Sequence, residues 1–387
     1  MYSDLIDFIR KLYNSSSTIP LHEPYFNDDE KKILAQVIDS TFVSSVGEMV
    51  NAFEEKIKLF TKSRYAIATV NGTSALHTGI ILSGVEANDE VITQSLTFVA
   101  TVNAIQYSGA KPLFLDVDKD SLSLSPESLE SFLTNHSEIR SDGYCWNLST
   151  NRRIKACVIM HTFGLPGRVK AIKSICEKHK IFLIEDAAES LGSIYEEKHT
   201  GTIADIGILS FNGNKIITTG GGGMILTQNE ALAEAARHLT TTAKLSHPWL
   251  FEHDKIGFNY RMPNLNAALG LAQMEKLKYF IEAKRKIASS YQSWGKENGL
   301  NFLKEIDNSK SNYWLNTMIV KDLLERDAIL DETNNNGVMT RPAWTPMHLL
   351  SLYKKYHSDI PLNNTEWLFD RIVNVPSGFS IQLNLRK

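Results

Sequence analysis

Short apolar runs alternate with amphipathic stretches from about residue 62 to residue 245. The apolar runs have the length and the flanking turn residues that are typical of buried strands, and the amphipathic stretches show helical spacing. We therefore predict strands at 65–70, 89–94, 111–118, 154–161, 181–186, 205–211 and 222–228. Helices are predicted at 71–84, 97–109, 168–180 and 229–240. This alternation predicts an α/β fold with a mostly parallel sheet that is covered on both faces.

The pattern changes beyond about residue 250. One long helical stretch, 264–299, leads into shorter strands and loops. Two further helices, 28–39 and 47–60, precede the first strand. A chain of 387 residues with 43% hydrophobic residues can bury more than one core. We expect a large domain at 1–250, which includes the N-terminal helices, and a smaller C-terminal α+β domain at 251–387.

Composition excludes several classes of partner. The formal net charge of -3 provides no polycationic field, so we expect no nucleic acid. No apolar run approaches the roughly 20 residues of a membrane span, so we expect no membrane insertion. The three cysteines have no metal-ligand spacing and no secretory signal precedes them, which predicts no metal, reduced thiols and a cytoplasmic location.

Several stretches at predicted strand ends carry candidate chemistry, because ligands of parallel sheets collect at the carboxyl edge. The first is TVNGTSALH, where Gly72 permits a close backbone approach and Thr73 begins a helix. Free N–H groups at a helix start form an anion site that suits a phosphate. The alternative is an ordinary capped helix after a glycine turn, which this stretch alone favours.

The second stretch, LIEDAAES, places Asp186 directly after four apolar strand residues. A buried carboxylate needs a partner, and a protonated ring nitrogen would serve. Two alternatives stay open. Asp186 could cap a helix instead, and Glu185 could be the functional acid.

The third stretch, SFNGNK, ends a strand at Ser210, whose hydroxyl could add a phosphate contact, and reaches Lys215 five residues later. A lysine amine can form an imine with an aldehyde, and glycines 220–223 would let the next turn pass close to a ligand. A solvated loop lysine is the alternative. Phe98 and Phe114 are both candidates to stack on a flat ring, and core packing is the alternative for each.

Together these stretches supply a phosphate cradle, an anion for a ring nitrogen, a stacking face and an imine-forming amine. Pyridoxal 5′-phosphate is the molecule that requires all four, since its sites combine a lysine Schiff base with an acidic partner for the pyridinium nitrogen. Asp186 would keep that nitrogen protonated by opposite charge. We therefore predict this cofactor.

The motifs NGTSALH, EDAAES, SFNGNK with its glycines, and GFNYRMPNLNAALG together resemble the DegT/DnrJ/EryC1/StrS sugar aminotransferases. The resemblance runs from about residue 20 to near the C-terminus. It implies fold type I of the pyridoxal phosphate enzymes, like that of aspartate aminotransferase. The stretch that begins IPLHEPYF further resembles the branch related to legionaminic acid and similar nonulosonic acid pathways.

The resemblance implies a role for each matching residue. Lys215 would be the catalytic lysine, which holds the cofactor and shuttles a proton. The residues implied to bind the cofactor are Gly72, Thr73, Ser74, Phe98, Asp186, Glu189, Ser210 and Asn259. Asn259 would reach the phosphate from the neighbouring subunit, which implies a homodimer with shared sites. Glu189 stands where the family often has a neutral residue, and Gly221 stands where many members have glutamate.

Four further residues are candidates for substrate contact: His161, Arg341, Trp344 and His348. Trp344 and His348 lie four residues apart, which is also ordinary spacing on a helix face. We weigh a structural role above a functional one for these four.

The resemblance implies transfer of an amino group, from L-glutamate, onto a nucleotide-linked 4-keto-6-deoxy hexose for surface glycans. Related dehydratases keep the cofactor but replace the lysine with histidine, whereas this chain has Lys215. The rivals are such a dehydratase-like enzyme, a non-catalytic cofactor-binding regulator, and a nicotinamide dehydrogenase. The sequence does not support the interpretation as a dehydrogenase, because the glycines of TTGGGGM do not lie between a predicted strand and a predicted helix.

Overall fold

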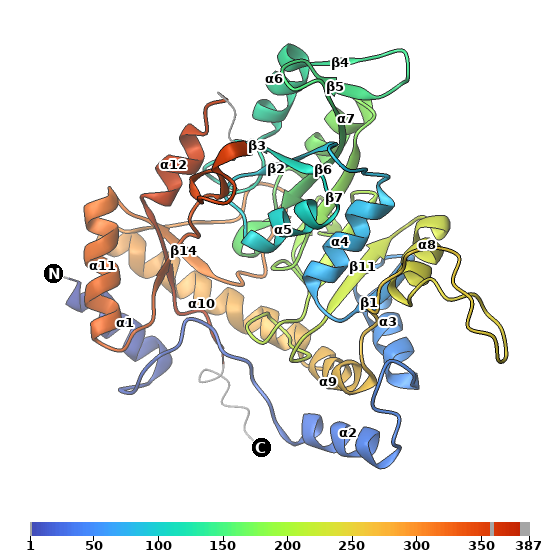
Figure 1. Ribbon diagram of the computed structural model, residues 1–387. Coiled ribbons are helices and arrows are strands. Elements are labelled where there is room, and N and C mark those ends of the chain that lie inside the picture. The colour runs from blue at the N-terminus through green and yellow to red at the C-terminus, as the bar shows by residue number, and fades with distance from the viewer. Residues whose placement is uncertain (1, 357–359, 380–387) are drawn as a thin grey trace.

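The computed structural model describes residues 2–356 and 360–379. A large sheet lies at the centre of the first part of the chain, with helices on both faces (Figure 1). Its strands, in spatial order, are β1 (Tyr65–Thr69), β11 (Gly223–Thr227), β10 (Ile206–Ser210), β7 (Phe182–Asp186), β6 (Arg152–Met160), β2 (Glu90–Gln94) and β3 (Lys111–Leu115). Neighbours in this order pair in parallel from β10 to β3, whereas β11 runs antiparallel to β1 and to β10. The predicted α/β fold is confirmed.

Helices cover the two faces of this sheet through separate apolar clusters. One face packs against α4 (Gly72–Leu82), α5 (Val99–Tyr107) and α8 (Glu230–Thr240). The other face packs against α3 (Glu48–Thr61), α6 (Pro126–His136), α7 (Val169–Lys178) and α9 (Asn264–Met274). Because helices cover both faces of the sheet, β2 and β11 are buried along their whole length, including the polar Glu90, Thr93 and Gln94 of β2.

The C-terminal part of the chain builds a smaller antiparallel sheet. Its strands, in spatial order, are β12 (Asn301–Phe302), β14 (Asn316–Ile319), β16 (Ile372–Val375) and β15 (Arg341–Pro342). The helices of this part are α10 (Leu277–Asn298), α11 (Leu323–Asn335) and α12 (Asn363–Phe369). Two short strands, β4 (Ser137–Ile139) and β5 (Cys145–Asn147), extend the large sheet through the pairing of β5 with β6. A third, small sheet contains β13 (Ser309–Lys310), β8 (Ile194–Tyr195) and β9 (Lys198–His199). Among the described residues, no helix combines the length and apolar character that a membrane span requires.

The predicted helix at 264–299 is two helices, because the chain breaks at Lys276. The Lys276 side chain donates to Glu30 at 2.7 Å and to Asn27 at 2.7 Å. Glu30 lies in α2 (Asp28–Asp39), and Asn27 caps that helix with a capping box. The break therefore serves a tertiary contact that hydrophobic spacing along the chain does not report.

The first helix, α1 (Ser3–Tyr13), lies beside α10 and α11 rather than beside the large sheet (Figure 1). Its buried stripe of Leu5, Ile6 and Ile9 shares a core with residues of the C-terminal part. The Tyr13 hydroxyl donates to the Pro376 carbonyl at 2.8 Å. The division of the chain at residue 250 stays a prediction. The outer ends of the two expected domains, residues 1 and 380–387, lie outside the described residues.

We predict that Ile9→Ala lowers the free energy of unfolding by about 2–5 kcal/mol, because it removes a fully buried side chain from the contact between α1 and the C-terminal elements. Denaturant unfolding followed by circular dichroism measures this change. The control is Asp7→Ala on the exposed side of the same helix, which should change stability by less than about 0.5 kcal/mol. Equal effects of both variants would contradict the placement of α1.

Candidate active site

Lys215 lies in the loop that joins β10 to β11, at the carboxyl edge of the large sheet. Its Nζ is 3.0 Å from Glu189 Oε1 and 4.1 Å from the centroid of the Trp314 ring. Only 12% of the Lys215 side chain is exposed. An ion pair and an aromatic face therefore hold the amine inside the protein, which excludes the solvated loop lysine of the sequence-based alternative.

Asp186 ends β7 and is buried. The Thr101 hydroxyl donates to Asp186 Oδ2 at 2.8 Å, and the Ala188 N–H donates to Oδ1 at 3.2 Å. Burial raises the pKa of Asp186. Within the described ranges this carboxylate forms no ion pair, so a cationic group on a ligand would supply the missing charge.

Glu185 has a different environment because neighbouring strand residues point to opposite faces. Its carboxylate accepts N–H hydrogen bonds from Gly201 (2.6 Å), Ile203 (2.7 Å) and Ala204 (2.6 Å). His161 Nε2 lies 3.0 Å from the same carboxylate. Burial alone would raise the pKa of Glu185, but these hydrogen bonds lower it overall. Glu185 is thus saturated by the protein, and Asp186 is the acid that faces the cavity.

The predicted anion site lies where β1 leads into α4. A Cβ at Gly72 would stand 3.0 Å from Ser210 Cβ, so glycine permits this close approach of the two strand ends. The Asn71 side chain caps α4 by accepting the Ser74 N–H at 2.8 Å. Gly72, Thr73 and Ser210 line the cavity, whereas Ser74 is buried outside the lining. The cap therefore does not exclude an anion site at this helix start, and the anion site stays a prediction.

Phe98 and Phe114 occupy different places. Phe98 precedes α5, is 46% exposed and contacts Trp344, with ring centroids 5.8 Å apart. Phe114 is buried in a separate apolar cluster with Val102 and Met347. Of these two aromatic residues, only Phe98 borders the cavity.

These groups converge on one cavity of about 390 Å³. The lining residues are Asn71, Gly72, Thr73, Leu76, Phe98, Ala100, Thr101, Met160, Asp186, Ala188, Glu189, Ser210, Asn212, Asn214, Lys215, Gly221, Gly222, Trp314 and Trp344. Most come from strand ends of the large sheet, and the two tryptophans come from the C-terminal part of the chain. The cavity thus combines oppositely charged side chains, Lys215 with Asp186 and Glu189, with the aromatic side chains Phe98, Trp314 and Trp344.

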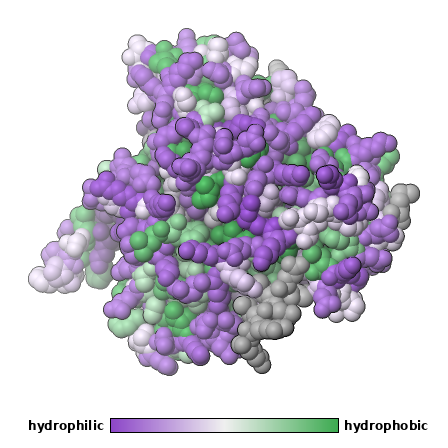
Figure 2. Space-filling model, turned by 180° about the vertical axis from the view of Figure 1, so that it is seen from behind, coloured by the Kyte–Doolittle hydropathy of each residue, from purple (hydrophilic) through white to green (hydrophobic). Residues whose placement is uncertain are grey.

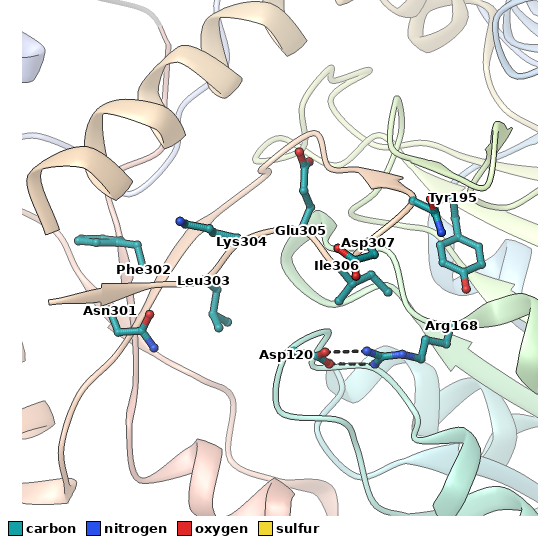
Figure 3. Close-up of a pocket in the computed structure, with 11 residues that line it drawn as sticks. Asp120, Arg168, Tyr195, Asn301, Phe302, Leu303, Lys304, Glu305, Ile306 and Asp307 are labelled. Atoms are coloured by element: carbon teal, nitrogen blue, oxygen red, sulfur yellow. Dashed lines mark hydrogen bonds and ion pairs between the residues drawn. The ribbon is translucent and has the colours of Figure 1, made fainter. Parts of the chain in front are cut away.

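A larger cavity of about 650 Å³ lies between Arg168 and the segment 301–308 (Figure 3). Figure 3 shows the Arg168 guanidinium facing Asp120, to which it makes two hydrogen bonds of 2.9 and 2.6 Å. Asp118 adds a third contact at 2.7 Å. Two carboxylates therefore already neutralise the Arg168 guanidinium in the larger cavity.

Three of the four predicted substrate residues lie outside the Lys215 cavity. His161 is fully buried, and both ring nitrogens bond to protein: Nε2 lies 3.0 Å from Glu185, and Nδ1 accepts the Gly167 N–H at 3.0 Å. Arg341 is exposed and donates to Asn334 at 2.8 Å. Other groups of the protein therefore bind these two side chains.

His348 is the third of these residues. It is buried beside Ser95, with 2.7 Å between Nδ1 and Oγ, and its Nε2 lies 3.2 Å from Glu366. Trp344, in contrast, lines the cavity. Asn259 lies in an exposed loop away from the cavity of its own chain.

Sequence reasoning missed several lining residues, above all Trp314, Thr101, Asn212 and Asn214. Trp314 is fixed by a hydrogen bond from its Nε1 to the Asn214 carbonyl at 2.7 Å. It lies about 100 residues from Lys215 along the chain, and no local pattern connects the two. Thr101 carried a usable signal, because it lies one helical turn after Phe98 at the start of α5.

With this geometry in place, the comparisons with known proteins can be interpreted. A model of the DegT/DnrJ/EryC1/StrS aminotransferase family matches residues 24–384. The chain belongs to the DegT/DnrJ/EryC1/StrS aminotransferase family. It is 34% identical over 363 residues to GDP-perosamine synthase of Escherichia coli O157:H7, covering 93% of each chain.

Solved structures agree with this family membership. Helicobacter pylori PseC, an aminotransferase involved in the biosynthesis of pseudoaminic acid, has a TM-score of 0.84 and 25% identity, with 94% of this chain and 96% of PseC covered. Bacillus subtilis NtdA with bound cofactor PMP has a TM-score of 0.79 and 25% identity, covering 92% of this chain and 78% of NtdA. The fold is therefore that of the fold type I pyridoxal phosphate aminotransferases.

Pyridoxal 5′-phosphate is the cofactor of this DegT-family chain. The geometry of the cavity also fits this cofactor. A Cβ at Gly223 would stand 2.4 Å from the Asn71 carbonyl oxygen, so the glycine turn and the start of α4 form one tight backbone cradle. The buried acid Asp186 lacks a cation, and the amine of Lys215 lies within the same cavity. These are the groups that a phosphate, a ring nitrogen and an aldehyde carbon require.

We predict that Asp186→Asn weakens cofactor binding about 10- to 100-fold, because asparagine keeps the shape of the side chain but loses the charge that stabilises a protonated ring nitrogen. Titration of the apoprotein with pyridoxal phosphate, followed by absorbance, gives the dissociation constant. Asp120→Asn in the larger cavity is the control and should bind with unchanged affinity. Unchanged affinity in Asp186→Asn would show that another residue pairs with the ring.

Proposed function

We propose that the protein transfers an amino group from L-glutamate to a nucleotide-linked 4-keto-6-deoxy hexose in the synthesis of a surface glycan. The observation that carries this proposal is the placement of the Lys215 amine in one cavity with the unpaired acid Asp186. The relatives support the class of acceptor, since one is named GDP-perosamine synthase and another acts in pseudoaminic acid biosynthesis.

In this proposal the chain's own residues divide the work. When bound, the cofactor supplies an electron sink for charge that develops on the substrate carbon. Lys215 holds the cofactor and moves a proton at that carbon, as general acid and general base. Asp186 would keep the ring nitrogen protonated, Phe98 would stack on the ring, and Glu189 would lie toward the ring hydroxyl, since all three side chains line the cavity.

The phosphate contacts come from Gly72, Thr73 and Ser210 at the carboxyl edge of the sheet. We propose that Ser74 contributes by keeping α4 capped, since its N–H binds the Asn71 side chain. Trp344 is the proposed acceptor contact, because it lines the open side of the cavity beside Phe98. We assign no substrate contact to His161, Arg341 or His348, which bond within the protein.

We further propose a cytoplasmic homodimer in which Asn259 completes the partner's phosphate site. Asn259 lies in the long connection between α8 and α9, which protrudes from the body of the chain (Figure 1). This connection exposes Trp249 (75%), Phe251 (80%) and Ile256 (87%). The reverse face of the molecule is mostly hydrophilic with separate apolar patches (Figure 2). Large apolar side chains that are this exposed favour burial against another subunit.

The direct test is to mix the purified holoprotein with glutamate and candidate nucleotide-linked keto sugars and to measure 2-oxoglutarate. We predict release of 2-oxoglutarate in proportion to amino sugar formed. Lys215→Ala should lower turnover at least about 100-fold, because it removes the group that moves the proton. Failure to exchange amino groups, with cofactor binding intact, would favour a cofactor-binding regulator. Normal turnover of Lys215→Ala would remove this residue from its role.

Shared active sites make a separate prediction. Lys215→Ala and Asn259→Ala homodimers should each lose activity, because each lacks one part of every site. A mixture dissociated and reassembled should regain about a quarter of wild-type activity, since half of the dimers would be mixed and would hold one intact site each. Turnover and light-scattering mass after mixing measure this. Activity that stays at the level of the separate variants would contradict a contribution of Asn259 across the interface.

A further inference from the structure

The Lys215 amine lies between two groups that both favour its charged form. Glu189 Oε1 lies 3.0 Å from Nζ, and the face of the Trp314 ring lies 4.1 Å from it. Glu189 is itself fixed, because its Oε2 accepts the Phe163 N–H at 2.9 Å. Both side chains of the ion pair are largely removed from water, and burial raises the pKa of Glu189 while the nearby Lys215 amine opposes that shift.

The other titratable groups near the ion pair of Lys215 and Glu189 have partners of their own or a pKa that burial shifts. Asp186 is the second acid of the cavity and is bound by Thr101 and Ala188. His22 also feels the charge of Lys215, but its pKa is lowered by burial first and then by Lys284 and Lys215, so His22 is neutral. Burial likewise lowers the pKa of Lys284. His161, which faces Asp186 from the neighbouring strand end, is committed to Glu185.

The charge state of Lys215 matters because an amine joins an aldehyde carbon through its lone pair. An ammonium ion must first release a proton, after which the carbon–nitrogen bond forms and one water molecule leaves. A hydrogen bond between ionised groups favours the charged form of the amine by about 10- to 100-fold. The ion pair with Glu189, which holds the Lys215 amine in place, therefore also opposes the formation of an imine by that amine.

We propose that Glu189 is a positioning residue that keeps Lys215 as an ammonium ion in the cofactor-free protein, and that the loss of this ion pair sets the pH at which the chain takes up its cofactor. The inference concerns cofactor uptake and does not depend on the identity of the sugar acceptor.

The test is the rate of recombination of the apoprotein with pyridoxal phosphate, measured by stopped-flow absorbance from mildly acidic to alkaline pH. Glu189→Gln keeps the side-chain length and an oxygen that can accept the Phe163 N–H. We expect the pH of half-maximal rate to fall by about one to two units in Glu189→Gln, which corresponds to the 10- to 100-fold bias. Glu189→Asp, which keeps the charge, should lie between this variant and the wild type.

Two further variants complete the experiment. Trp314→Leu removes the aromatic face and should shift the profile in the same direction by less than about one unit. Glu305→Gln removes a carboxylate that pairs with Arg285 at 2.7 Å, outside the cavity, and should leave the profile unchanged. A Glu189→Gln profile that superimposes on the wild type overturns the proposal. Should that variant not fold by circular dichroism, a Glu189→Asp profile that superimposes on the wild type overturns it.

Discussion

The antiparallel pairing of β11 between β1 and β10 is the constraint on which the rest of the site depends. Because β11 reverses direction, its first residues meet the last residues of both neighbours at one edge of the sheet. Gly223 pairs with Thr69 on one side and with Ser210 on the other. The start of α4, the loop of Lys215 and the glycine turn are thereby brought within reach of one ligand. A side chain at Gly223 would collide with the Asn71 carbonyl, so the packing itself requires glycine.

The second determinant is the contribution of the C-terminal part of the chain. Trp314 and Trp344 close the side of the cavity that the large sheet leaves open, and Trp314 also contacts the Lys215 amine. The Lys215 amine is thus positioned both by the large sheet and by the C-terminal part of the chain, through Glu189 and Trp314.

Much of this arrangement could be predicted from the sequence, and particular residues show which parts could not. Apolar runs bounded by turn residues located the strands of the large sheet, and the topology of parallel strands then predicted that Gly72, Asp186 and Ser210 share an edge. Hydrophobic spacing could not detect the break at Lys276, because the contact that causes it lies in α2. It also left α1 unassigned, although Leu5, Ile6 and Ile9 form a helical stripe. Trp314 lies far from Lys215 in sequence and reaches it only through the tertiary fold.

The central claim is that Lys215 is the residue that carries the cofactor. Borohydride reduction of the holoprotein, followed by proteolysis and mass spectrometry, tests it most directly, because reduction makes the link between amine and cofactor permanent. The account predicts one modified peptide, with the pyridoxyl group on Lys215. Modification of a different lysine, or of none after the cofactor has bound, would contradict it.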